Sequence, residues 1–300
     1  IAMNKEAVMA YDYHVRMQDW DGIIALAGKK LPDTPMAVSC LNLALGMKGQ
    51  LADRMFHYRQ RGKEGLFMSF VNDFTIPLVA AEPYYYPGMV NTAQQLVFEA
   101  MEAIPDYQKS VRCFKRLAET NLINGRYEVA GKYLRILQHT LFYKDWATEM
   151  LACLDDEARI DAHPEYGRLR KLTPQTDLFF NPAEPEMTLS LLLQANPENR
   201  MAYEYLMGIT LLKKDMGRFV HYYPLGEKLG YRSIPKSYQE ALLFGWSMQK
   251  HTPGEEIPWK INRETGERLR EYARIYTSTR SEEALAPRFG DTYWFYVHFR

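Results

Sequence analysis

Apolar residues recur at three- and four-residue steps along most of this chain, the spacing that places them on one face of an α-helix. The pattern is clear over residues 5–17 and again over residues 20–30. Segment 32–35 then separates this pair from the next helix, because Thr34 is suited to the N-cap and Pro35 to the first helical position. The chain is therefore predicted to begin with paired helices.

The same periodicity predicts helices over most of the remaining chain. They cover residues 36–48, 51–58, 67–74, 89–104, 106–123, 127–141, 144–158, 187–195, 200–214, 219–229, 236–250, 264–279 and 281–286. Asp106 is expected to cap the helix at 106–123. Segment 82–88 contains Pro83 and Pro87 and is expected to be an ordered loop, since proline interrupts helical hydrogen bonding. The aromatic end, 292–299, alternates too poorly for a strand and is expected to cover the last hairpin.

Four polar turns follow apolar helical patterns, each where one helix of an antiparallel pair would end and its partner begin. They are Gln18-Asp19-Trp20, Gly49-Gln50-Leu51, Gly125-Arg126-Tyr127 and Gly217-Arg218-Phe219. Gly125 is expected to adopt the left-handed conformation that ends a helix. This recurrence predicts a stack of helical hairpins.

The segment 111–144 resembles a tetratricopeptide repeat (TPR), a helix-turn-helix unit of 34 residues. Leu117, Ala118, Gly125, Tyr127 and Ala130 match the repeat's packing and turn positions. The two alanines allow the helices to approach closely, and the larger side chains fill the groove beside them. The other copies keep the turn but lack some small residues, and the four turns are unevenly spaced.

The resemblance implies an all-α fold, a TPR-like α-α superhelix of irregular helical hairpins. Residues 1–162 would form N-terminal hairpins and residues 187–300 C-terminal hairpins of one continuous superhelix. Residues 163–186 contain four prolines and little periodicity, so we expect an irregular joint there. Within it, Leu178-Phe179-Phe180 should be buried.

Composition argues against several classes of function and site. With 37 basic and 37 acidic residues, the chain has no net charge to attract nucleic acid or an anionic membrane surface. The three cysteines, Cys40, Cys113 and Cys153, have neither disulfide-framework nor zinc-site spacing. Aromatic residues make up 13% of the chain and are expected to fill gaps between helices.

No HExxH, GxGxxG, Walker-type or GxSxG pattern occurs in the sequence. The nearest approach to a catalytic or metal-binding cluster is His163 with Asp161 and Glu165, and it precedes Pro164 in a predicted loop. We therefore predict a protein that is not an enzyme and has no cofactor or metal. An enzyme site in the irregular segments 163–186 or 251–262 remains an alternative.

A partner-binding groove is predicted from the TPR resemblance, because partner peptides usually lie along the first helix of each hairpin. The positions in this row are Arg112, Lys115 and Glu119 of one hairpin and Glu204, Met207, Leu211 and Lys214 of another. Mixed charges over an apolar floor suit a peptide segment. The alternative is an ordinary solvated helix face.

Tyr84-Tyr85-Tyr86, between two prolines, is a candidate aromatic patch. If exposed, it would suit a glycan-binding module, because aromatic rings stack on sugars. If buried, it would cap the neighbouring hairpins, and this is the interpretation we favour.

No run of 18 apolar residues and no secretion signal occurs, yet the chain begins with Ile1 and not Met. We expect it to be part of a larger protein. The segments QDWDGIIALA and DTYWFYVHF make it similar to the soluble C-terminal part of an uncharacterised bacterial membrane-protein family. That resemblance implies attachment to a membrane by segments outside this chain, on the extracytoplasmic side, and no known activity. The predicted function is a non-catalytic scaffold or adaptor domain that binds a protein or peptide and no nucleic acid.

Overall fold

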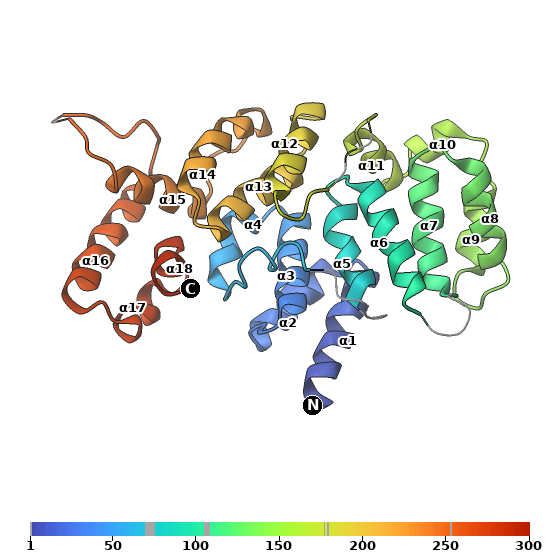
Figure 1. Cartoon of the computed structure of the whole chain (residues 1–300), viewed down its shortest axis with the longest axis horizontal. Helices are drawn as coiled ribbons and strands as arrows, with labels where there is room; N and C mark the ends of the chain where they lie inside the picture. Colours follow the sequence, from blue (N-terminus) through green and yellow to red (C-terminus); the bar gives the residue numbers. More distant parts are fainter. Residues whose placement is uncertain (1, 70–75, 105–108, 177, 179, 253) are drawn as a thin grey trace. The chain divides into compact units, whose positions relative to one another are not determined.

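All regular structure in the described part of the chain is helical. A computed structural model describes residues 2–69, 76–104, 109–176, 178, 180–252 and 254–300. Within these ranges it contains eighteen α-helices and two 3-10 helices (Figure 1). The predicted all-α class is confirmed, and the helices pack in hairpin-like pairs.

The chain forms two compact units. Phe67–Ala202 forms one, here named the hairpin unit. Ile1–Leu66 and Tyr203–Arg300 together form the other, named the split unit. The predicted parts follow one another along the chain, whereas the split unit joins two stretches that are far apart in sequence.

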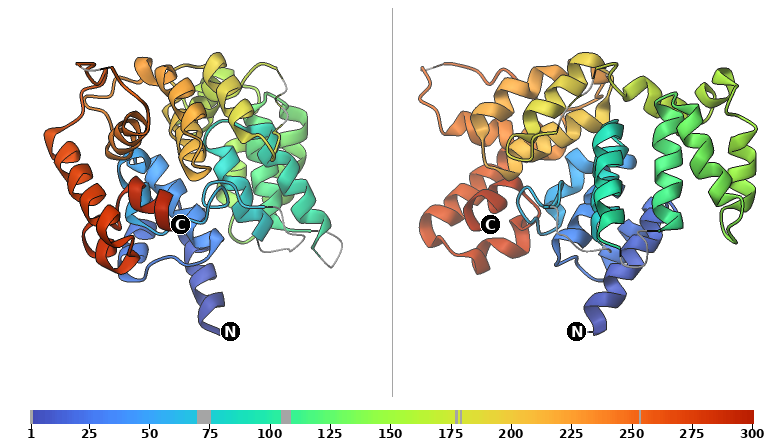
Figure 2. Two further views of the ribbon diagram at one scale, coloured as in Figure 1. Left: turned by 60° about the vertical axis from the view of Figure 1, so that its left-hand side comes forward. Right: turned by 45° about the vertical axis from the view of Figure 1, so that its right-hand side comes forward.

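In the hairpin unit, helices α5 to α9 form a row in which each helix contacts the next (Figures 1 and 2). α11 packs against α7, in the middle of that row. The helices of this unit are α5 (Ile76–Tyr85), α6 (Val90–Glu102), α7 (Val111–Ile123), α8 (Tyr127–Leu137), α9 (Lys144–Leu151), α10 (Glu157–Asp161), α11 (Tyr166–Leu172) and α12 (Pro185–Ala195).

In the split unit, α15 is the central helix and contacts α4, α14, α16 and α18. α16, α17 and α18 form one group beside it, drawn in red in Figure 2. The helices of this unit are α1 (Ala2–Arg16), α2 (Trp20–Lys29), α3 (Pro35–Met47), α4 (Leu51–Arg54), α13 (Arg200–Leu212, from Tyr203 onward), α14 (Met216–Tyr222), α15 (Lys236–Ser247), α16 (Arg263–Thr279), α17 (Glu282–Phe289) and α18 (Tyr293–Phe299). The 3-10 helices are Met55–His57 and Tyr223–Leu229.

Five hairpins share one turn. In each, a single residue has positive φ: Gln18 (53°), Gly49 (65°), Gly88 (103°), Gly125 (68°) or Lys214 (58°). Its N–H bonds to the carbonyl three residues back, and the next N–H bonds five residues back, which together make a Schellman motif. The residue after it is also the N-cap of the following helix. The predicted left-handed conformation of Gly125 is confirmed.

The expected loop at 82–88 is wrong in its first half. α5 continues to Tyr85 with Pro83 inside it, so Pro83 lacks the N–H that would bond to the carbonyl of Val79. The tyrosines that follow are buried. Gly88 then makes a hairpin turn, which was not predicted because the prolines on either side indicated a loop. With Gly88 included, the first four turns lie 31 to 39 residues apart, close to the 34-residue period of a TPR.

The predicted turn at Gly217 is also misplaced. Gly217 lies inside α14, and the turn falls at Lys214 and Asp215. The Asp215 side chain accepts the N–H of Arg218, which starts the helix before the glycine. Lys214 adopts the left-handed conformation although it has a Cβ. The turn was misplaced because the prediction assigned it to the nearest glycine.

Several helix ends differ from prediction. Thr34 caps α3 and accepts the N–H of Ala37, as predicted. Asp106 lies outside the described residues, and Ser110 caps α7. The predicted helix 144–158 is two helices, α9 and α10, and the predicted joint 163–186 contains helix α11.

The aromatic end of the chain is buried in the structure, whereas the aromatic segment at 178–180 is only partly buried. The chain end is helix α18, which packs on α15 and α17 with Tyr293, Trp294, Phe295 and Tyr296 buried. Leu178 and Phe180 are half-buried, not fully buried, and Phe179 lies outside the described residues. The predicted helix at 67–74 is absent over 67–69, and 70–75 lie outside the described residues.

Candidate functional site

A buried group of charges joins α5, α7 and α11 in the hairpin unit. Arg116 donates from Nη2 to both carboxylate oxygens of Glu82, at 2.9 and 2.7 Å. Its Nη1 donates to Glu119 at 2.8 Å and lies 3.9 Å from Glu165. The guanidinium lies over the ring of Tyr85, 3.7 Å from the centroid, and the Tyr85 hydroxyl donates to Glu165 at 2.7 Å. We call these five residues the Arg116 cluster.

Two further side chains complete the surroundings of Glu119. Lys115 forms a 2.5 Å ion pair with it and lies over the ring of Trp146. The Tyr166 hydroxyl, from α11, donates to Glu119 at 3.2 Å. Glu119 therefore has three donors although it is buried, which is the condition for keeping a carboxylate charged in the interior.

The pKa values in this cluster reflect opposing causes. Burial raises the pKa of Glu82, while Arg116 and Arg112 act in the opposite direction. Burial also disfavours the ionised form of Glu119, but Lys115 and Arg116 outweigh it and lower its pKa. Since the cluster's charges are paired with one another, its arrangement is that of a structural ion network.

The predicted groove is not open at α7. Arg112 and Lys115 are half-buried, and Glu119 is buried beneath Tyr166 of α11. These three residues were predicted from helical spacing, but Arg116, which joins Glu82 and Glu119, was not. Helical spacing gave no sign that Glu82 and Glu165 converge on it from other helices.

The second predicted row is mostly core. Glu204, Met207 and Leu211 are buried within the split unit, and Lys214 is exposed at the α13–α14 turn. A partner can reach only Lys214 of these four, so the row does not form the expected groove floor. The two rows belong to different compact units.

Tyr84, Tyr85 and Tyr86 are buried, as the favoured interpretation expects, with exposures of 5%, 0% and 1%. Tyr84 packs against Phe67 and Phe180. These rings are unavailable for stacking on a sugar.

His163 caps α11. Its Nδ1 accepts the N–H groups of Glu165 and Tyr166, and its ring stacks on Tyr166 at 4.0 Å. These contacts give His163 a structural role beside Asp161 and Glu165. Throughout the described ranges, no group of three or more His, Cys, Asp or Glu residues is placed to hold a metal ion.

A polar pocket of about 210 Å³ lies in the split unit between α4, the start of α15, the start of α16 and α18. The residues that matter most among its lining are Asp53, Lys236, Gln239, Glu240, Glu264 and Arg268. One wall is braced by Gln239, whose Oε1 accepts the N–H of Asn262 and the hydroxyl of Thr265. This pocket was not predicted from the sequence, because its residues share no local pattern.

Glu240 is the buried carboxyl of the polar pocket, with 2% exposure. Its Oε2 accepts the N–H of Tyr293 at 2.8 Å, and its backbone carbonyl accepts the Trp294 indole N–H at 2.8 Å. Lys236 Nζ lies 3.7 Å from Oε1. Burial raises the pKa of Glu240 to about 7, despite the opposing effect of Lys236.

Lys236 and Arg268 are both directed to Asp291. Lys236 Nζ lies 2.6 Å from one carboxylate oxygen, and Arg268 Nη2 lies 3.1 Å from the other. Burial disfavours the charge of Asp291, but these two cations lower its pKa. One carboxylate thus holds both cations of the pocket wall.

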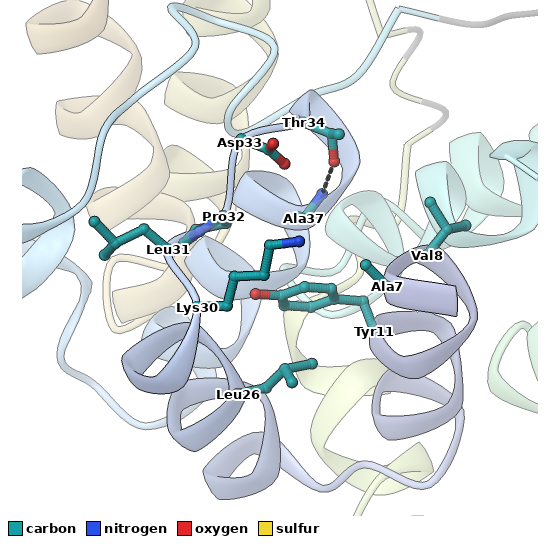
Figure 3. Close-up of a pocket in the computed structure, with 10 residues that line it drawn as sticks. All are labelled: Ala7, Val8, Tyr11, Leu26, Lys30, Leu31, Pro32, Asp33, Thr34 and Ala37. Atoms are coloured by element: carbon teal, nitrogen blue, oxygen red, sulfur yellow. Dashed lines mark hydrogen bonds between the residues drawn. The ribbon is translucent and has the colours of Figure 1, made fainter. Parts of the chain in front are cut away.

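A second pocket, of about 50 Å³, is mostly apolar and lies among α1, α2 and α3 (Figure 3). Tyr11 and Leu26 face it, with Lys30 above the Tyr11 ring. Burial raises the pKa of Tyr11 to about 12. Its size suits ordered water and no larger ligand.

Within the described residues, no helix combines the length and the apolar character needed to cross a membrane. No curated protein and no solved structure matches the chain. One family model does match it, over residues 1–300, and its description is "Family of unknown function (DUF6057)". The chain therefore belongs to the DUF6057 family.

Proposed function

We propose that this chain is a non-catalytic interaction domain that binds a segment of another protein on the outer surface of its helical hairpins. Stacked helical hairpins form extended surfaces that can bind extended or helical segments of partner proteins. The proposal keeps the scaffold or adaptor role expected from the sequence and moves the binding surface away from the predicted groove.

One observation carries the proposal: an exposed apolar surface on α8 and the turn that follows it. Leu141 and Phe142 are 88% and 84% exposed, and Ile136 and Val129 of α8 are 47% and 37% exposed. We call these four residues the α8 patch. Leu141 and Phe142 are neighbours in the chain, and Val129 and Ile136 lie seven residues apart on one side of α8. Exposed apolar side chains grouped in this way are typical of a surface that a partner covers.

The charges around the α8 patch favour an acidic partner. Lys132, Arg135 and Lys144 are exposed beside it on α8 and at the start of α9, and they outnumber the exposed carboxylates of the same segments, Glu128 and Asp145. An amphipathic segment with apolar anchors and acidic flanks would cover the patch and pair with this basic rim.

Two finer expectations belong to the same proposal. The hairpins would continue as a TPR-like superhelix, which the near-regular spacing of the first four turns supports. The domain would also be held at a membrane, on its extracytoplasmic side, by segments outside residues 1–300. The glycan-binding alternative has no comparable support, because Tyr84, Tyr85 and Tyr86 are buried.

Photocrosslinking tests the proposal. A benzoylphenylalanine at position 142 of the full-length protein, in the cells that produce it, should yield a few discrete adducts with an acidic amphipathic segment. The matched control is the same probe at Met248, which is 73% exposed in the split unit. Identical products at both positions would contradict the proposal.

A binding measurement with the crosslinked segment completes the test. The double variant Leu141→Ser, Phe142→Ser should bind it at least about tenfold more weakly, while Met248→Ser should bind it normally. Equal binding by all three proteins would exclude the α8 patch as the binding surface.

A further inference from the structure

The polar pocket of the split unit holds more negative than positive charge. Its lining contains the carboxylates of Asp53, Glu240 and Glu264 and the cations Lys236 and Arg268. Asp291, beside the lining, already pairs with both cations. With every group ionised, four carboxylates therefore face two cations.

Glu240 is the group in this pocket that lacks a complete set of partners. Its Oε2 is occupied by the Tyr293 N–H. Among the described residues, its Oε1 has no hydrogen-bond donor, and the nearest cation is Lys236 Nζ at 3.7 Å. Glu240 lines the pocket and is 2% exposed, so a ligand in the pocket that donates to Oε1 would add a hydrogen bond that the neighbouring side chains do not supply.

The pocket is large enough for such a ligand. Its volume of about 210 Å³ far exceeds the ~10–15 Å³ that one water requires. Asp53 and Glu264, both exposed, lie at its edge, and Gln239 keeps one wall in place through Asn262 and Thr265.

We infer that the polar pocket binds an ammonium or guanidinium group, which donates to Oε1 of Glu240 while Asp53 and Glu264 attract it at the entrance. The group could belong to a free alkylamine or to a Lys or Arg side chain of a partner. In both cases the chemistry is the same: a cation on a flexible apolar stem. This inference does not depend on the α8 patch, which lies in the other unit.

The charges facing Glu240 come from every element packed against it. Lys236 lies on its own helix, Arg268 on α16, and Asp291 just before α18. Asp53 lies on α4, and His57, 3.9 Å from Asp291, on the following 3-10 helix. Burial and Lys236 both lower the pKa of His57, so it remains neutral near pH 7 and adds no competing charge.

Titration with n-butylammonium chloride tests the inference. The Tyr293 amide and the Trp294 indole N–H, both bonded to Glu240, should show saturable NMR shifts. Since the pKa of Glu240 is about 7, affinity should be about tenfold higher at pH 8 than at pH 6. n-Butanol and sodium chloride at the same concentrations should produce no saturable shift.

Two variants locate the site. Glu240→Gln keeps an oxygen for the Tyr293 N–H but loses the charge, so binding should weaken at least about tenfold and lose its pH dependence. Glu283→Gln changes an exposed carboxylate of α17 outside the pocket and should bind normally. The spectrum of each variant away from the pocket shows whether the fold is intact. Unchanged binding by Glu240→Gln, or saturation by n-butanol, would overturn the inference.

A further arm identifies the source of the cation. The peptides acetyl-Gly-Lys-Gly-amide and acetyl-Gly-norleucine-Gly-amide differ only by the ammonium group. Tighter binding of the lysine peptide than of n-butylammonium indicates a partner's side chain. Binding of n-butylammonium with no binding of the lysine peptide indicates a free amine. Failure of both cations would refute the inference.

Discussion

Arg116 and Glu82 form a two-bond ion pair that connects α7 to α5 across 34 residues of chain. Both side chains are largely excluded from water, with exposures of 14% and 8%. Both bonds come from Nη2, while Nη1 donates to Glu119, and the Tyr85 ring lies against the guanidinium. The pair and its neighbours fix how the helices of the hairpin unit meet.

Removal of Arg116 should destabilise the protein strongly. In Arg116→Met, Glu82 loses its ion-pair partner and remains buried, so the free energy of unfolding should fall by about 3–5 kcal/mol. Urea denaturation followed by circular dichroism measures this. As a control, Arg263→Met breaks the exposed pair with Glu267 and should change stability by less than about 1 kcal/mol. Similar losses in both variants would contradict a special role for Arg116.

Tyr85→Phe and Tyr84→Phe form a matched test of the same cluster. The Tyr85 hydroxyl donates to the Glu165 carboxylate, so its removal should cost about 1.5–3 kcal/mol. The Tyr84 ring is also buried and packed on aromatic neighbours, but no hydrogen bond from its hydroxyl accompanies that packing in the described structure. Tyr84→Phe should therefore be close to neutral in thermal unfolding. A larger loss for Tyr84→Phe would show that packing, not the charged hydrogen bond, dominates.

Gly125→Ala should destabilise the α7–α8 hairpin. A Cβ at Gly125 would meet no atom within 4 Å, so the effect isolates the positive φ of 68° and should cost about 1–2 kcal/mol. Gly266→Ala is the control, because Gly266 has equally free space but lies within helix α16. There alanine should stabilise by about 0.5–1 kcal/mol. Chemical denaturation compares the two, and the same sign for both would refute the argument.

Glu240 should make stability depend on pH. The folded protein holds the Glu240 proton up to about pH 7, whereas the unfolded chain releases it near pH 4.5. The folded state therefore binds more protons in this window, and the free energy of unfolding should fall as pH rises through it, by up to about 3 kcal/mol. Glu240→Gln should flatten that part of the profile, measured by urea denaturation from pH 4.5 to 8. An equally steep profile for Glu240→Gln would assign the effect to other groups.

Local chemistry made some of the fold predictable. Thr34 followed by Pro35 identifies a helix start, and Gly125 after an apolar helical run identifies a left-handed turn, because each depends only on neighbours in the chain. The same reasoning failed at Lys214 and at Pro83. There the packing of the surrounding helices sustains a lysine with positive φ and a proline within a helix, against their local preferences.

The candidate sites were less predictable. Helical spacing placed Arg112, Lys115 and Glu119 on one face of α7, but it could not show that α11 covers that face. It also gave no reason to select Glu240, because burial raises its pKa and its backbone partner Tyr293 lies 53 positions away.

The sequence by itself determined the helical class, most helix positions and three of the five hairpin turns, since these depend on periodicity and capping over a few residues. Tertiary structure alone decided which charges meet at Arg116 and that Asp53, Glu240 and Arg268 line one pocket. Desolvation and ion pairing act through space, and no local pattern records which distant side chains the folded chain brings together.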